Sequence, residues 1–285
     1  MLLMYRHSHL EKYVGTTEPP KTWDELLEYS KKYTDPPDVY GINLSGAKGL
    51  MTSEIAYVFL TNLGEKFFGE EGNMIFNSPE TIKALKMYKE LFQYAPVGAE
   101  AWSWGEMEMN IVSGTIAIVP YFTGLQKRFH EELDSNDYAG AHMPYPEDGQ
   151  SGTITYPNEI HVFKQAEERG HLDAVKKFIR FIVRPEINYI LTAVQEPVIF
   201  YPTTKAAVKA PKFWANPIIF RYKQTNVVAF EALEYATLYG FEYGRWVNLE
   251  IGDITGGGVL AEVVHKIVTG EMSVEEAVEW SHKKM

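Results

Sequence analysis

The stretch Glu18–Leu26 reads EPPKTWDEL, and it fixes the start of a helix. Two consecutive prolines favour extended backbone and interrupt any helix that precedes them. Thr22 is then placed to cap a new helix, and Glu25, three residues later, is placed to bond back to the cap. The apolar residues that follow predict an amphipathic helix that ends near Tyr33.

Short apolar stretches alternate with such helices along the chain. Gly41–Leu44 and Thr115–Val119 are brief and rich in apolar residues, which favours buried strands, and 153–156 and 160–163 are also strand-like. Ser78 followed by Pro79 begins another helix. Further helices are predicted over 53–63, 104–112, 122–133, 166–183, 216–238, 253–269 and 273–283. Interleaved short strands and longer helices predict the α/β fold class.

Composition restricts the functions that this chain can have. Its 285 residues suit one large domain or two lobes, and 45% hydrophobic residues allow a sizeable core. The net charge of −11 and the scattered Lys and Arg residues disfavour a nucleic-acid partner. Without cysteine, disulfides and thiolate metal sites are excluded. No apolar run reaches the roughly 18–20 residues of a membrane span.

Aromatic residues, 14% of the chain, gather in predicted loops. Four clusters lie near element ends: Trp102–Trp104, Tyr121–Phe122, Tyr156–Asn158 and Arg245–Asn248. In α/β folds, ligands bind where loops leave the strand ends. Flat rings can stack on the apolar faces of a sugar, and Asn or Arg can bond to its hydroxyls. Each cluster alone is equally consistent with core packing, but four at loop positions favour a sugar site.

Motifs for metal binding and catalysis do not stand out. His7 and His9 have no carboxylate cluster beside them, and Gly256–Gly258 lacks the spacing of a phosphate loop. Glu106 and Glu108 are two residues apart, so on a helix they diverge by roughly 200° and cannot form a glycosidase pair. We therefore predict no catalytic residue, metal or cofactor. Two alternatives stay open: a glycoside hydrolase-like enzyme that uses Glu106 with a distant acid, and a purely structural domain.

Several motifs occur in the order typical of one family. EPPKTWDEL, the start of a helix at Ser78-Pro79-Glu80, the segment from Trp104 to Ile118, the helix at 174–181 and the closing stretch 268–277 together resemble the family 1 extracellular solute-binding proteins. That family includes the maltodextrin-binding proteins. The resemblance spans essentially the whole chain, and the shared order of the motifs is more specific than any one of them.

The resemblance implies a periplasmic-binding-protein-like (type II) fold, in which two α/β lobes close on a ligand. It implies capture of a sugar or oligosaccharide for the membrane permease subunits of an ABC importer, with no catalytic residues. The ligand-binding residues that it implies are Lys48, Trp104, Tyr121, Phe122, Tyr156, Asn158 and Trp246.

The sequence departs from the family pattern at its beginning, because only about twenty residues precede EPPKTWDEL. On this basis we expect 1–148 and 204–285 to form the C-terminal lobe and 149–203 to be a remnant of the N-terminal lobe. Met1–Tyr5 is too short for the apolar region of a signal peptide, so none is expected in this chain, although the full-length form is expected at the cell surface. An incomplete lobe would weaken sugar binding and leave sheet edges open to self-association.

Overall fold

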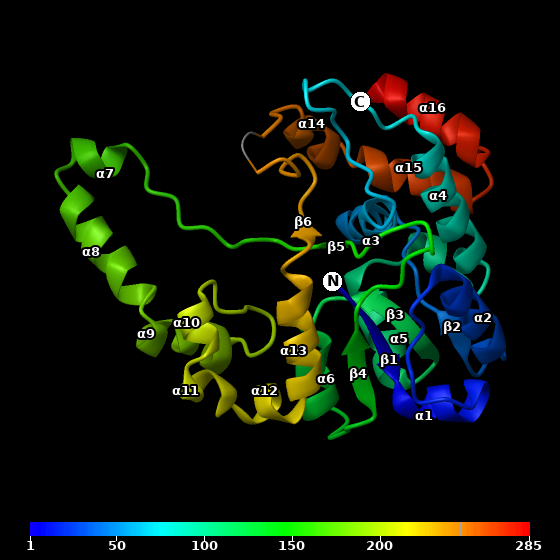
Figure 1. The fold of residues 1–285 in the computed structure, drawn as a ribbon, viewed down its shortest axis with the longest axis horizontal. Helices are drawn as coiled ribbons and strands as arrows, with labels where there is room; N and C mark the ends of the chain where they lie inside the picture. The colour runs from blue at the N-terminus through cyan, green and yellow to red at the C-terminus, as the bar shows by residue number, and fades with distance from the viewer. Residues whose placement is uncertain (245–246) are drawn as a thin grey trace. The chain divides into compact units, whose positions relative to one another are not determined.

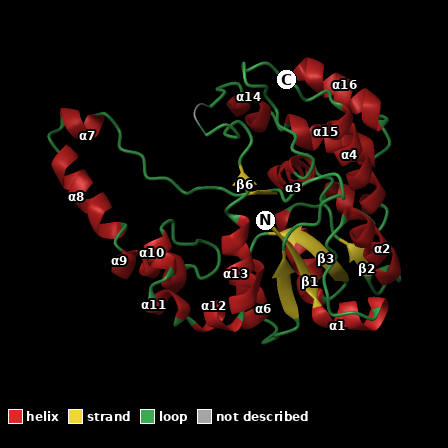
Figure 2. Ribbon diagram, in the orientation of Figure 1, coloured by secondary structure: helices red, strands yellow, loops and turns green. Residues whose placement is uncertain are grey.

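The computed structural model describes residues 1–244 and 247–285 (Figures 1 and 2). Its strands are β1 (Leu2–Arg6), β2 (Tyr40–Ile42), β3 (Ile116–Tyr121), β4 (Tyr138–Ala141), β5 (Thr153–Ile154) and β6 (Ala236–Thr237). Its α-helices are α1 (His7–His9), α2 (Trp23–Tyr33), α3 (Leu50–Thr61), α4 (Pro79–Phe92), α5 (Trp104–Ser113), α6 (Leu125–Glu131), α7 (Gln165–Glu168), α8 (Leu172–Ile182), α9 (Pro185–Tyr189), α10 (Lys205–Val208), α11 (Pro211–Trp214), α12 (Pro217–Arg221), α13 (Lys223–Ala232), α14 (Ile251–Gly256), α15 (Val259–Val268) and α16 (Val274–Lys284). Shorter π- and 3-10 helices are η1 (Leu10–Val14), η2 (Ala99–Ala101) and η3 (Ile190–Gln195).

The chain divides into two compact units. Unit 1 comprises Met1–Phe122, Asp137–Thr155 and Val227–Met285, and unit 2 comprises Thr123–Asn136 and Tyr156–Asn226. The main sheet and the helices packed on it belong to unit 1. The regular structure of unit 2 is helical.

The main sheet of unit 1 has the strand order β2-β3-β1-β4 (yellow in Figure 2). β1 runs antiparallel to both of its neighbours, with Met4 opposite Val119 on one side and Gly140 on the other. β2 is parallel to β3. Every residue of β3 is buried, which explains why its sequence is almost continuously apolar and does not alternate.

Helix α3 forms the centre of the remaining unit 1 core. All its residues from Met51 to Thr61 are buried, as expected of a helix that is largely apolar on every side. It packs against α4 and α15, and α15 packs against α16. On the sheet, α2 contacts β2 and α5 contacts β3. The carboxyl end of β3 therefore lies beside α5, the arrangement on which the candidate site depends.

The helix starts predicted at Thr22 and Ser78 are confirmed. Thr22 Oγ1 accepts a hydrogen bond from the Glu25 backbone N–H at 3.1 Å, and Glu25 Oε2 accepts from the Thr22 N–H at 3.3 Å. Ser78 Oγ caps α4 through the Thr81 N–H at 2.9 Å. Each cap satisfies a backbone donor that the first turn of a helix would otherwise leave unpaired.

Three element predictions that involve unit 2 are wrong. The helix predicted over 216–238 is divided into α12 and α13, and its last residues include strand β6. The helix predicted over 166–183 is split into α7 and α8, because Gly170 has a φ of +71° and ends the first helix. The strand predicted over 160–163 has no regular structure. A strand needs a hydrogen-bonded neighbour, and this segment lies outside both sheets.

The boundaries of the two units differ from those of the predicted lobes. Residues 123–136 and 204–226, which we assigned to the C-terminal lobe, belong to unit 2. Residues 149–155, assigned to the remnant, belong to unit 1. The correspondence between these units and the lobes of the family stays a prediction.

Candidate functional site

Three of the predicted ligand residues form an aromatic cluster in unit 1. The Trp104 ring, at the start of α5, stacks on the Phe122 ring with 5.7 Å between centroids and 24° between planes. It meets the Tyr121 ring edge to face at 5.5 Å and 77°. Trp104 enters from α5, whereas Tyr121 and Phe122 stand at the end of β3. We call Trp104, Tyr121 and Phe122 the aromatic cluster.

Burial separates the roles of these rings. Tyr121 is only 2% exposed, so its ring belongs to the core beneath the cluster. Trp104 and Phe122 are half-buried, so each residue is partly accessible to solvent. Stacked rings that are partly exposed offer an apolar surface to a ligand, while the buried Tyr121 supports them from below.

Glu108 adds a carboxylate to the cluster. The Tyr121 hydroxyl donates to Glu108 Oε1 at 2.6 Å, and it also approaches the Trp104 carbonyl oxygen at 3.4 Å. Trp104 and Glu108 are four residues apart on α5, so their side chains leave the same face of the helix. Sequence analysis considered Glu108 only as half of an acid pair with Glu106. The i, i+4 spacing from Trp104 was the signal that could have found it.

Glu106 has a different role, which is to cap helix α5. Its Oε2 accepts a hydrogen bond from the Ser103 backbone N–H at 3.0 Å, which closes the first turn of α5. This bond lowers the pKa of the Glu106 carboxyl, which keeps it ionised. Glu106 therefore anchors the helix that carries Trp104 and Glu108.

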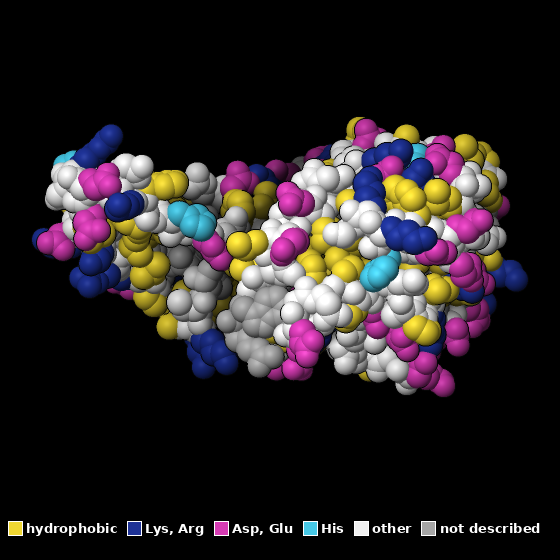
Figure 3. All heavy atoms as spheres, turned by 90° about the horizontal axis from the view of Figure 1, so that it is seen from above, with side chains coloured by type: hydrophobic (Ala, Val, Ile, Leu, Met, Phe, Trp, Pro, Cys, Tyr) yellow, Lys and Arg dark blue, Asp and Glu magenta, His cyan; other side chains and the backbone are white. Residues whose placement is uncertain are grey.

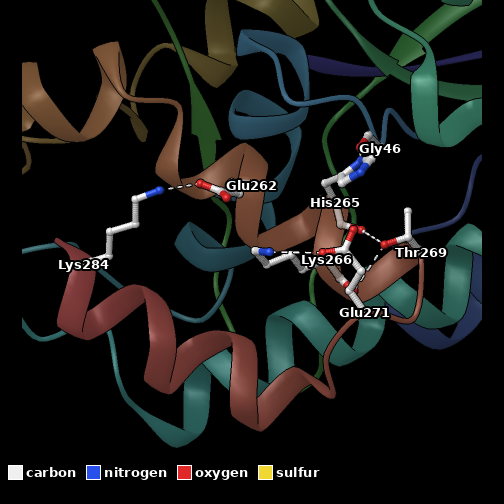
Figure 4. Close-up of polar contacts among 7 residues, drawn as sticks. All are labelled: Gly46, Glu262, His265, Lys266, Thr269, Glu271 and Lys284. Carbon is white, nitrogen blue, oxygen red and sulfur yellow. Dashed lines mark hydrogen bonds and ion pairs between the residues drawn. The ribbon is translucent and has the colours of Figure 1, made fainter.

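Lys48 lies in the loop between β2 and α3, which is tied to both α5 and α15. Ser45 Oγ donates to the Trp102 carbonyl oxygen at 2.6 Å. His265 Nδ1 donates to the Gly46 carbonyl oxygen at 2.9 Å (Figure 4). The loop therefore runs close to the start of α5, and Lys48 itself is exposed.

The charge of Lys48 acts on two carboxylates of the neighbouring network in Figure 4. The pKa of Glu262 is lowered first by its bond with Lys284 and more weakly by Lys48. The pKa of Glu271 is lowered first by its bond with Lys266, 3.1 Å away, and again more weakly by Lys48. Lys48 therefore has a weak electrostatic effect on these two carboxylates, and a ligand role for it stays a prediction.

The other three predicted residues are not tested by the structure. Tyr156 and Asn158 are exposed and belong to a stretch of unit 2 without regular structure; Tyr156 is 38% exposed. Trp246 lies outside the described residues. The ligand roles of all three stay predictions.

The segments on both sides of residues 245–246 are anchored on the turn that follows α3. Tyr243 Oη donates to the Phe68 carbonyl oxygen at 3.0 Å. Asn248 Nδ2 donates to the Gly72 carbonyl oxygen at 3.1 Å, and this side chain is buried. We predicted Asn248 as part of a cluster near the ligand. In the structure its side-chain amide bonds to the backbone of the turn at Gly72.

A half-buried carboxylate, that of Glu242, completes this anchor. Burial raises the pKa of Glu242, although hydrogen bonds to its carboxylate, including one donated by Tyr57 Oη at 3.1 Å, oppose that rise. Tyr57 also stacks on Phe67 at 5.9 Å. Buried rings and hydrogen bonds together fix Glu242, Tyr243 and Asn248 to the core of unit 1.

Among residues 1–244 and 247–285, no group of three or more His, Asp and Glu side chains is arranged to hold a metal ion. Within the same residues, no helix has both the length and the apolar character needed to cross a bilayer.

The fold is an α/β fold of the type II periplasmic-binding-protein-like kind. A solved solute-binding protein of an ABC transporter from Agrobacterium radiobacter K84, in complex with ribitol, superposes with a TM-score of 0.76 at 22% identity; the match covers 99% of this chain and 68% of that one. Maltose-bound MalE3 of T. maritima gives 0.74 at 20% identity, covering 99% and 69%.

The chain belongs to the bacterial extracellular solute-binding protein family, whose sequence profile matches residues 1–189. A curated relative, the candidate ABC transporter periplasmic-binding protein YcjN of Escherichia coli (strain K12), is 24% identical over 284 residues. The alignment covers 99% of this chain and 64% of YcjN, so the chain spans less than two thirds of that relative. The predicted fold class and family are confirmed.

Proposed function

We propose that this chain captures a sugar or polyol for an ABC importer, and that the aromatic cluster with Glu108 is its ligand surface in unit 1. The observation that carries this proposal is the combination of two stacked, half-exposed rings with a carboxylate held one turn along the same helix. Rings cover the apolar C–H face of a polyhydroxy ligand, and the carboxylate accepts from its hydroxyl groups.

Relatives support the choice of ligand class. One solved neighbour is a complex with ribitol, and another is maltose-bound. Both ligands combine C–H surfaces with vicinal hydroxyl groups, and neither is charged. The membrane permease subunits of an importer are the proposed protein partner, and the proposed location is outside the cytoplasmic membrane, in keeping with the family.

We infer that the chain binds its ligand and does not transform it. A glycoside hydrolase places two carboxyl groups on opposite sides of one bond, roughly 5–9.5 Å apart. Of the two acids on α5, Glu106 closes the first turn of the helix, whereas Glu108 bonds to Tyr121. The hydrogen bond of Glu106 to the Ser103 backbone disfavours the enzyme alternative, in which Glu106 acts with a distant acid. Lys48, Tyr156, Asn158 and Trp246 complete the proposed set of ligand residues.

The test is ligand-observed NMR with ribitol and maltose, a method that detects weak, millimolar binding. We expect Trp104→Ala to lower affinity for the bound ligand by about tenfold or more, because stacking contributes on the order of 1–1.5 kcal/mol beyond the buried area. Trp214→Ala, in unit 2, is the control. Equal affinity for the wild type and Trp104→Ala would contradict the proposed site.

We further propose that the chain self-associates, with unit 2 of one copy against unit 1 of another. Unit 1 carries 14 Lys and Arg against 29 Asp and Glu, and unit 2 carries 13 against 9. Net charges of −15 and +4 attract between copies. Apolar side chains also reach the surface among the charged ones (Figure 3). Phe178 and Phe181 of unit 2 are exposed. Sedimentation velocity should show oligomers that weaken in high salt; a monomer at all concentrations and salts would refute this.

A further inference from the structure

We propose that helix α8 of one copy of this chain docks on a groove in unit 1 of a second copy. This inference rests on the proposed self-association and goes further, because it names the two surfaces that meet and the charges that select them. It does not involve the aromatic cluster, so sugar capture and this contact can be tested separately.

The groove lies between helices α4 and α2 and has a volume of about 590 Å³. One wall is a single face of α4, because its lining residues recur at the spacing of three and four that keeps side chains together on a helix: Pro79, Ile82, Lys83, Lys86, Met87 and Glu90. The other wall consists of residues 22–24, at the start of α2, and 146–148. Apolar residues of both walls, among them Trp23, Ile82 and Met87, contribute to the lining. A groove of this size accepts a few large side chains but not a whole helix, so a helical partner has to lie across it.

The charges left unpaired around the groove are negative. Both lysines of the lining are already engaged: Lys83 Nζ donates to the two carboxylate oxygens of Asp148 at 2.6 Å each, and Lys86 pairs with Glu275 of α16 at 2.5 Å. Three exposed acids of the lining have no salt bridge to any other residue that the structure describes: Asp24, Glu90 and Glu147. The groove therefore favours a partner that combines apolar side chains with positive charge.

Helix α8 has both of these features. None of its residues is buried, and the side chains of Phe178 and Phe181 are 60% and 47% exposed. Residues 172–182 contain three basic residues and one acidic residue. At roughly 100° per residue, Lys176 and Lys177 lie at the two edges of the apolar face, so they flank any surface on which that face rests. Within the described part of the chain, neither lysine forms a salt bridge.

Charge also argues for the groove over a second α8 helix as the surface that α8 covers. Two α8 helices placed face to face would bury apolar side chains, but each carries an excess of basic residues and would repel the other. In the groove the same rings are removed from water, and the flanking lysines meet unpaired carboxylates. The apolar contact supplies the affinity, and the charges decide which surface is chosen.

The test uses one variant for each surface, measured by sedimentation velocity over a range of concentrations. Phe178→Gln with Phe181→Gln removes the rings from α8, and glutamine keeps a good helix propensity. Glu90→Lys with Glu147→Lys turns the edge of the groove from attractive to repulsive for α8. All four positions are exposed, so we expect both variants to fold. Each should raise the dissociation constant for self-association by about tenfold or more, because each removes the contact from one side.

A matched control separates the groove from the overall charge of unit 1. Glu100→Lys with Glu234→Lys makes the same change in net charge at two exposed positions of unit 1 outside the groove. We expect it to weaken self-association by about tenfold less than the groove variant does. Mixing the α8 variant with the groove variant then restores one complete contact, between the intact groove of the first and the intact α8 of the second. The mixture should form a 1:1 complex that neither variant forms alone.

The outcomes distinguish this inference from the proposals on which it rests. A 1:1 complex in the mixture, with both variants monomeric alone, supports the assignment of the two surfaces. A groove variant that associates like its control, or a mixture that stays monomeric, overturns the assignment and leaves self-association standing. The first of these results is also the one expected if α8 pairs with a second α8. A wild type that is monomeric at every concentration would overturn self-association and this inference together, and it would leave sugar capture to its own test.

Discussion

Helix α3 of unit 1 is buried on every side, whereas no residue of helix α8 of unit 2 is buried. In α3 every side chain from Met51 to Thr61 is buried, between α4 and α15. In α8 the apolar and charged residues are cleanly separated, yet Phe178 is 60% exposed. The difference indicates that unit 1 contains its own core, while the apolar face of α8 lacks one within unit 2.

The largest expected effect tests this difference with one substitution in each unit. Phe59, in α3, is 1% exposed and meets the rings of Trp23 and Tyr88 at 5.6 Å each. Phe59→Ala should lower the free energy of unfolding by about 3–5 kcal/mol, because it removes buried surface and leaves a cavity. Phe178→Ala should change it by no more than about 0.5 kcal/mol.

Urea unfolding followed by circular dichroism measures both values. A loss of more than about 2 kcal/mol in Phe178→Ala would show that α8 is buried in solution, and the comparison between the units would fail. Measuring both variants at several protein concentrations separates burial within one copy from burial between copies, because only the second depends on concentration.

A smaller effect sharpens the comparison through two glycines with positive φ. Gly240, in unit 1, has a φ of +80°, and a Cβ there would lie 2.7 Å from Ile251. Gly170, in unit 2, has a φ of +71° and no atom within 4 Å of such a Cβ. Both substitutions by alanine incur backbone strain of order 1–3 kcal/mol, but only Gly240→Ala adds a clash.

We therefore expect Gly240→Ala to lower the free energy of unfolding of unit 1 more than Gly170→Ala lowers that of unit 2. The expected difference between the two losses is roughly 1–3 kcal/mol. Differential scanning calorimetry of the two variants measures the difference. Equal destabilisation would mean that unit 1 relaxes around the new methyl group, and that its core near Ile251 is less tightly packed than the structure indicates.

Helix starts in unit 1 could be predicted from the sequence because their causes are local. The caps at Thr22 and Ser78 depend on residues three positions apart, and each appears as predicted. The buried strand β3 was also predictable, since six consecutive buried residues leave a continuous apolar run. Local hydrogen bonding and hydrophobic patterning were sufficient for these elements.

Unit 2 was harder to predict because its secondary structure depends on the tertiary neighbours of each segment, which the sequence does not reveal. Residues 160–163 have the composition of a strand but no strand to pair with, and sequence patterns do not reveal a missing neighbour. The sequence does contain a glycine, Gly170, at the point where the predicted helix breaks. A single glycine inside a helical pattern is often tolerated, so it was not decisive.

The candidate site was predicted in part. The aromatic cluster follows from residue type and from position at the ends of β3 and α5, both of which the sequence reveals. The role of Glu108 depends on a contact with Tyr121 across thirteen residues. The charge of Lys48 weakly lowers the pKa of Glu262, which is more than two hundred residues away in the sequence. Such tertiary contacts could not be derived from spacing along the chain.

Hydrogen–deuterium exchange with and without saturating ribitol or maltose tests the central claim most directly, that unit 1 holds the ligand at the aromatic cluster. We predict that the ligand that binds slows exchange in peptides covering 104–108 and 121–122. Peptides from 172–182 in α8 should exchange at the same rate with and without ligand. Protection confined to α8, or binding that leaves both parts of the cluster unprotected, would contradict the account.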